Sequence, residues 1–318
     1  MEDGLWEILL GKPLLKKVGI DVEQQLDNLA EDHKVLEVDF GIDKSLEEDG
    51  DMGLDEHLSI LVADTALNVA DNVVLSKLQP ILNRYRSYFK SDMVTMDAAR
   101  VAPFELEMKK HSQHIRSAQR RHSPLISTVM AEQVGDLLNA GYIYKNPNLR
   151  CIFACMPVRK PGVSKWRLTI DYREVNKLII PKCGMMPTRL LDMKGKTRFK
   201  VLDLHIGFWQ LPLHKSSSEI LAFATDTGIY TPLRVPQRSM DSDLHFQGCM
   251  ADCFRSLINV NFLIWIDDIL LFADNDLECF EVLSKVSNIA DDKKLRINVR
   301  KSKLFLSGVT WFGKVYNG

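Results

Sequence analysis

The chain has 318 residues, of which 46% are hydrophobic, enough for one large domain or two modest domains with cores of their own. Its net charge of −1 conceals an asymmetry, since residues 1–100 carry −11, residues 101–200 carry +12 and residues 201–318 carry −2. The middle third is therefore expected to face a polyanion. The acidic start and the lack of an apolar run of ~18 residues predict an intracellular chain, cytoplasmic or nuclear, with no signal peptide, transmembrane segment or membrane partner.

The first 89 residues fall into three expected segments. Residues 4–30 predict a strand, a turn and a short helix, whereas residues 31–77 are acidic, contain the run Glu47-Glu48-Asp49-Gly50-Asp51, and predict a disordered linker. Apolar residues at helical spacing within 78–89 then predict a short helix.

Six cysteines are present, and four of them form two pairs, Cys151/Cys155 and Cys249/Cys253. Neither pair has the two-residue spacing of a zinc knuckle, and no His-x3-5-His follows. We therefore expect thiols packed in the core.

The basic middle third begins near Lys109 and leads into a helix. Ser123-Pro124 is a helix start signal, apolar residues then recur on one face, and Gly141 is the expected stop. Tyr142 and Tyr144 follow, and aromatics beside cations favour a surface that binds a nucleic-acid strand over a charged face that is only solvated.

Residues 160–177 predict two strands joined by a Pro-Gly turn. Lys160, Lys165 and Arg167 would then lie on a mobile flap, where cations can hold a triphosphate. Residues 187–195 predict a helix that begins at Pro187 and ends at Gly195.

Carboxylates follow two strand-like runs. Asp203 lies at the end of the run Arg198–Leu204, and Asp267-Asp268 separates two apolar runs of five residues each, a pattern that predicts a hairpin with the acids in its turn. An ordinary Asp-Asp turn is the competing interpretation. Three such acids brought together would instead suit two Mg²⁺ ions, with Mn²⁺ as a substitute, since these hard cations take oxygen ligands.

Asp226-Thr227-Gly228 mimics the signature of aspartic proteases, but it lies between strand-like runs. A hairpin turn is the better interpretation, because Asp-Thr-Gly is ordinary turn chemistry and a protease would need a partner copy.

These motifs resemble the reverse transcriptases of retroviruses and of gypsy-type long-terminal-repeat retrotransposons. Trp265-Ile266-Asp267-Asp268 is similar to the aromatic-x-Asp-Asp box of that family, and residues 160–177 are similar to its fingers. The resemblance covers residues 78–318 and implies an α+β fold: a polymerase palm with a small antiparallel sheet backed by helices, plus a fingers subdomain, ending at the primer-grip hairpin without a thumb. Residues 1–30 resemble, more weakly, the tail of a retropepsin.

The resemblance also implies roles for individual residues. Asp203, Asp267 and Asp268 would be the catalytic and metal-binding residues of an RNA-directed DNA polymerase, a nucleotidyltransferase that adds deoxynucleoside triphosphates to a primer on an RNA or DNA template. The implied nucleotide-binding residues are Lys160, Arg167, Phe208 and Gln237, and the implied primer-grip residues are Phe312 and Gly313. Other retrotransposon domains would act in trans.

Two departures from the family pattern leave a second hypothesis open. Arg238 stands where the family has Gly after Pro-Gln, which adds bulk and charge beside the nucleotide pocket, and the helix over 187–195 is about one turn short. The alternative is a catalytically inactive retrotransposon remnant or a nucleic-acid-binding module without turnover.

Overall fold

A computed structural model describes residues 53–69, 72–90, 94–110, 117, 122–147, 149, 151–159, 166–182, 184, 193, 195–311 and 314–317. All of them belong to the unit Gly41–Gly318, the second of the two units into which the chain divides. The retropepsin-like tail expected over residues 1–30 lies outside the described residues and stays a prediction. None of the helices that are described is both long and apolar enough to cross a membrane.

The first sheet has five strands in the order β1-β10-β5-β9-β8. Its strands are β1 (Phe89–Lys90), β5 (Arg198–Leu204), β8 (Phe262–Trp265), β9 (Asp268–Ala273) and β10 (Ile297–Leu306). The pairs within it are antiparallel, except for β1 with β10. Strand β9 lies between β5 and β8, and its residues Ile269 to Ala273 are all buried, which fits an apolar run covered on both faces.

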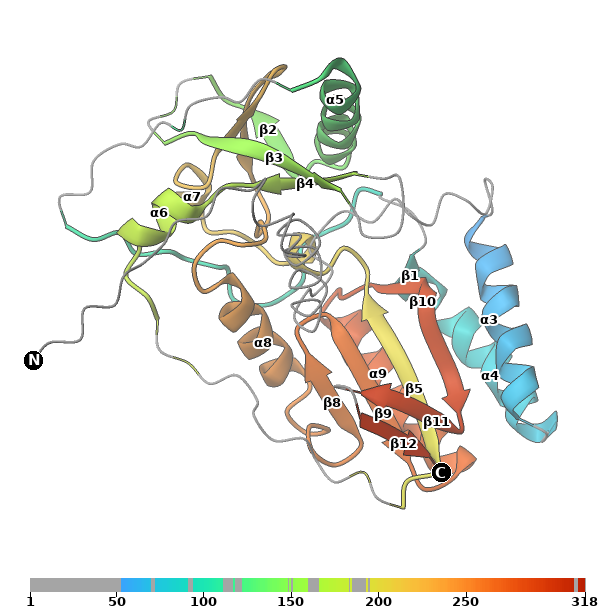
Figure 1. Cartoon of the computed structure of the whole chain (residues 1–318). Coiled ribbons are helices and arrows are strands. Elements are labelled where there is room, and N and C mark those ends of the chain that lie inside the picture. Colours follow the sequence, from blue (N-terminus) through green and yellow to red (C-terminus); the bar gives the residue numbers. More distant parts are fainter. Residues whose placement is uncertain are drawn as a thin grey trace, which may run out of the picture. The chain divides into compact units, whose positions relative to one another are not determined.

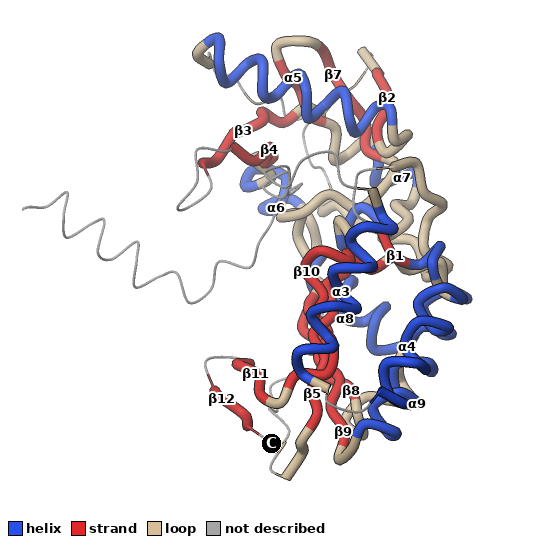
Figure 2. The backbone as a smooth tube through the Cα atoms, turned by 90° about the vertical axis from the view of Figure 1, so that its right-hand side faces the viewer, coloured by secondary structure: helices blue, strands red, loops and turns tan. Residues whose placement is uncertain are grey.

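Four helices accompany this sheet: α3 (Leu54–Asn68), α4 (Asn72–Arg84), α8 (Ser242–Cys253) and α9 (Asp276–Asp292). In Figure 2, α4 and α9 lie on one side of the sheet and the hairpin of β11 (Gly308–Trp311) and β12 (Lys314–Asn317) lies on the other. Val309 and Trp311 of that hairpin pack in one apolar cluster with Phe199 and Phe272 of the sheet. This layering of helices on a sheet confirms the expected α+β palm (Figure 1).

The second sheet, in the order β2-β7-β6-β3-β4, forms the fingers part. Its strands are β2 (Ile143–Lys145), β3 (Phe153–Arg159), β4 (Trp166–Ile170), β6 (Phe223–Thr225) and β7 (Gly228–Pro232). Helix α5 (Pro124–Asn139) packs beside it, and Gly141 follows with a φ of 72°, so the predicted start and stop of this helix are confirmed. The short helices are α6 (Arg173–Leu178), α7 (Lys215–Ser218) and the 3-10 turns η2 (Arg86–Tyr88) and η3 (Gly207–Gln210).

The hairpin expected at Asp226-Thr227-Gly228 is confirmed, because β6 and β7 pair with Thr225 opposite Gly228. The linker expected over residues 31–77 is wrong in its described part, since α3 occupies Leu54–Asn68 and contacts β10. Leu58 and Leu61 are buried there, so a few apolar residues at helical spacing outweigh the acidic composition. The helix expected over 187–195 falls mostly outside the described residues.

Candidate active site

The predicted acids meet on two neighbouring strands of the palm sheet. Asp203 on β5 is the direct Cα partner of Asp268, the first residue of β9. Directly opposite residues of an antiparallel pair point to the same face of a sheet. Asp267 lies in the turn between β8 and β9, one residue before Asp268. Asp203 is therefore brought to the same corner of the sheet as Asp267 and Asp268, although it lies far from them in the sequence.

The turn that carries Asp267 is held from two sides. Gln247 on α8 accepts a hydrogen bond from the Ile266 N–H (2.8 Å) and donates one to the Ile264 carbonyl (3.2 Å). On the other side, the Leu204 N–H of β5 donates to the Asp267 carbonyl (3.0 Å). One buried amide side chain and one backbone contact thus fix the turn on both α8 and β5.

Two strained backbone positions lie next to the acids. Ile266 has a φ of 55° and Ile206, three residues after Asp203, has a φ of 47°. The left-handed region is a real outlier for a β-branched residue and costs about 1–3 kcal/mol. Such strain persists only where the surrounding contacts over-determine the backbone, as they do around Ile266.

The carboxylates of Asp203 and Asp268 repel that of Asp267. Burial, followed by the charges of Asp268 and Asp203, raises the pKa of Asp267 to about 8. Lys301 of β10 offsets this in part, with its Nζ 3.6 Å from Asp203 Oδ2. Oxygen ligands that repel one another in this way suit a hard divalent cation. Among the described residues no three such side chains already converge on one metal position, so an ion would have to draw the carboxylates together.

Gly207 and Phe208 form the floor beside Asp267. A Cβ on Gly207 would lie 3.2 Å from the Asp267 Cβ, so only glycine leaves the carboxylate its present space. Phe208 is buried, and its ring centroid lies 4.8 Å from that of Phe246 on α8. The predicted aromatic therefore packs against α8, directly after the glycine that lies beside Asp267, and its predicted role at the sugar stays a prediction.

The loop before α8 contains the departure from the family pattern. Arg238 is exposed and has a φ of 67°, so an arginine occupies a backbone conformation that favours glycine. Asn176 of α6 holds this loop by donating to the Arg238 carbonyl (3.1 Å) and accepting from the Met240 N–H (2.8 Å). Gln237, the predicted nucleotide contact, precedes Arg238 and is partly exposed.

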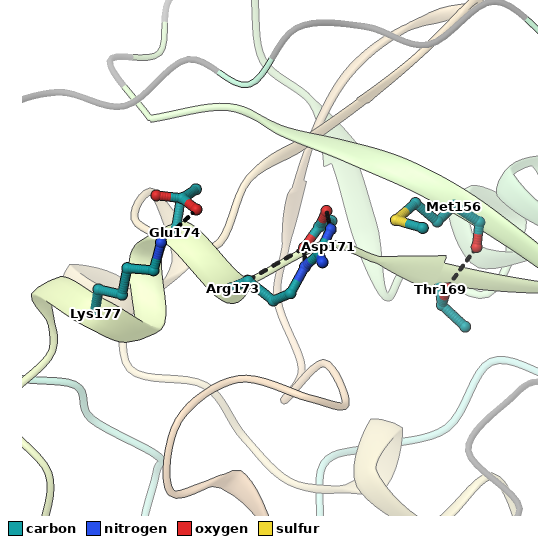
Figure 3. A network of polar contacts seen from close by, with 6 residues as sticks. All are labelled: Met156, Thr169, Asp171, Arg173, Glu174 and Lys177. Carbon is teal, nitrogen blue, oxygen red and sulfur yellow. Dashed lines mark hydrogen bonds and ion pairs between the residues drawn. The ribbon is translucent and has the colours of Figure 1, made fainter. Parts of the chain in front are cut away.

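The predicted flap is described only at its base. Lys160 lies outside the described residues, and the backbone of Arg167 pairs with Val158 across β3 and β4. Figure 3 shows polar contacts within this hairpin and directly after it. Thr169 donates to the Met156 carbonyl (2.5 Å) across the strands, and after β4 Arg173 contacts Asp171 through two hydrogen bonds (2.7 and 2.6 Å).

Farther along α6, Figure 3 also shows Lys177 paired with Glu174 at 2.8 Å. Both side chains are largely exposed, so this ion pair adds little stability. The primer-grip residues Phe312 and Gly313 lie outside the described residues, between the paired strands β11 and β12.

The structure adds residues whose roles could not be predicted from the sequence. Gln247 and Asn176 hold backbone turns through their amides, Gly207 leaves room for Asp267, and Lys301 approaches Asp203. No sequence pattern says which backbone atoms the two amides reach.

A match to a protein family agrees with these observations. Residues 158–315, which include all three acids, match the family described as reverse transcriptase (RNA-dependent DNA polymerase). The chain carries a reverse transcriptase domain. Its relatives include the retrovirus-related Pol polyprotein from transposon 297 of Drosophila melanogaster, 27% identical over 250 residues that cover 75% of this chain and 23% of that protein. The Pro-Pol polyprotein of simian foamy virus type 1 is 30% identical over 183 residues, covering 57% of this chain and 16% of the relative.

Solved structures agree on the fold of the reverse transcriptase domain. The foamy viral protease-reverse transcriptase in complex with dsDNA superposes with a TM-score of 0.74 at 22% identity, covering 83% of this chain and 54% of that one. The same viral protein in complex with RNA/DNA hybrid gives a TM-score of 0.71 at 21% identity, covering 83% of this chain and 35% of that one. The chain spans less than a quarter of the length of the two relatives above.

Proposed function

We propose that this reverse transcriptase domain catalyses template-directed addition of deoxynucleoside triphosphates to a primer 3′-hydroxyl. The observation that carries the proposal is the meeting of Asp203, Asp267 and Asp268 at a strained turn that Gln247 holds in place. Crowded carboxylates destabilise a fold unless a cation or a polar reaction centre lies opposite them. The family match and the complexes of the foamy viral protein with nucleic acid support the same conclusion.

In this proposal Asp203 and Asp267 hold two Mg²⁺ ions, Mn²⁺ being a substitute, and Asp268 supports them. When bound, such ions lower the pKa of an attacking hydroxyl and stabilise the leaving pyrophosphate. By holding the ions, Asp203 and Asp267 would orient the reacting groups. Gly207 keeps the Asp267 carboxylate from being pushed aside.

The nucleotide would lie between the palm and the fingers residues. Lys160 and Arg167 are proposed to contact its triphosphate, Gln237 to contact the nucleotide, and Phe208 to exclude a 2′-hydroxyl. Phe312 and Gly313 would hold the primer end.

The template would be RNA or DNA, bound mainly through its phosphates, so affinity should fall steeply with salt. Other retrotransposon domains would act on the same nucleic acid in trans, in the cytoplasm or nucleus.

A specific observation favours the second candidate, a domain that binds nucleic acid without turnover. Arg238 puts a long cationic side chain in a left-handed turn beside Gln237, where a glycine would let the backbone approach a ligand closely. A pocket blocked at this one residue would leave the surrounding surface able to bind nucleic acid.

Primer extension on poly(rA)/oligo(dT) with Mg²⁺ decides between the two candidates. We expect incorporation by the unaltered chain and none by Asp267→Asn. Signal from Arg238→Gly alone would mark a sound pocket blocked at one residue. No incorporation by either the unaltered chain or Arg238→Gly, with nucleic-acid binding retained, would support the binding module and contradict the polymerase.

A further inference from the structure

A second pair of potential ligands lies on α8, one turn apart and outside the carboxylate cluster. Cys249 follows His245 by four residues, so both side chains project from the same face of the helix. The Cys249 Sγ lies 3.4 Å from the His245 Nε2. Cys249 is buried, as expected for a core thiol, and it is one of the free cysteines of the described residues.

The separation of the two atoms fits a tetrahedral zinc centre. Zinc binds thiolate sulfur at about 2.3 Å and imidazole nitrogen at about 2.0–2.1 Å, so at a tetrahedral angle the two ligand atoms lie about 3.5 Å apart. The observed 3.4 Å is close to that separation. Thiolate with imidazole is also a donor set that selects soft and borderline cations over Mg²⁺.

The imidazole is arranged as a ligand would be. The Nε2 of His245 faces the thiol of Cys249. The ring also packs against Phe104, with centroids 5.0 Å apart, so its orientation is fixed.

We propose that His245 and Cys249 form a site for a thiophilic divalent cation of the Zn²⁺ and Cd²⁺ class. The two side chains supply two ligands, and water supplies the others, because among the described residues no third His, Cys, Asp or Glu joins them. The bound ion bridges the helical turn that contains Gln247, the residue that holds the catalytic turn. The site depends on neither polymerase activity nor the carboxylates.

Cadmium titration of the full chain in a phosphine reductant tests the proposal, because cadmium–thiolate bonds absorb in the ultraviolet and carboxylate sites do not. We expect one equivalent to produce the band in the unaltered chain. Cys249→Ser should lose the band, His245→Asn should bind at least about tenfold more weakly, and Cys151→Ser, a matched cysteine control in the fingers, should behave as the unaltered chain.

Absence of the band from the unaltered chain, its persistence in Cys249→Ser, or unchanged affinity in His245→Asn would each overturn the site. A second measurement covers variants that fold poorly: Zn²⁺ should raise the Tm of the unaltered chain and of Cys151→Ser. It should not raise the Tm of His245→Asn, and an equal rise there would also overturn the proposal.

Discussion

Replacing Arg238 by glycine should stabilise the fold, although no core contact changes. At a φ of 67° a residue with a Cβ costs about 1–2 kcal/mol more than glycine. Glycine gives back about 0.4–1 kcal/mol through the greater freedom of the unfolded chain. The net gain should be about 1 kcal/mol, or a rise in Tm of about 2 °C for a chain of this size.

Urea denaturation of the unaltered chain, Arg238→Gly and Arg238→Ala measures this gain. Alanine removes the charge and length of arginine but keeps the Cβ, so it separates backbone strain from side-chain contacts. We expect a higher midpoint for Arg238→Gly than for Arg238→Ala. Equal midpoints would refute the strain argument, whatever incorporation assays show.

Three further changes test the surroundings of the acids. In metal-free buffer Asp267→Asn should be more stable than the unaltered chain, by a margin that grows from pH 5 to pH 8. The pKa of Asp267 is about 8 in the folded chain and about 3.9 in the unfolded chain, so the free energy of unfolding of the unaltered chain falls as pH rises between these values. Denaturation at pH 5 and pH 8 checks the trend. Gln247→Met leaves the Ile264 carbonyl and the Ile266 N–H without this partner and should cost about 2 kcal/mol or more, measured by thermal unfolding; a loss below 0.5 kcal/mol would contradict the clamp. Gly207→Ala should lower incorporation about tenfold with little loss of Tm, because its Cβ would crowd Asp267; an unchanged rate would show that the carboxylate can give way.

The acidic hairpin could be predicted because its local signals agree. Apolar runs on both sides of Asp267-Asp268 are long enough for strands, and β8 and β9 occupy Phe262–Trp265 and Asp268–Ala273. Strand β10 (Ile297–Leu306) is less regular, because its register shifts relative to β5.

Other features have no local signal. Isoleucine disfavours the left-handed region, so no sequence pattern predicts the conformations of Ile206 and Ile266. The contacts of Gln247 and Asn176 join residues that are 17–19 and 62–64 positions apart, and only the folded chain determines them.

These two amides together link α6 to the turn of Asp267 by way of α8. Asn176 ties α6 to the loop that enters α8, and Gln247 ties α8 to the turn of Asp267. Each amide uses its donor and its acceptor at once, so a carboxylate of the same shape would place oxygen against a carbonyl and break the chain of contacts. Spontaneous deamidation of either side chain would therefore act as an ageing lesion that loosens the loop or the turn that the amide holds, while every acid remains in place.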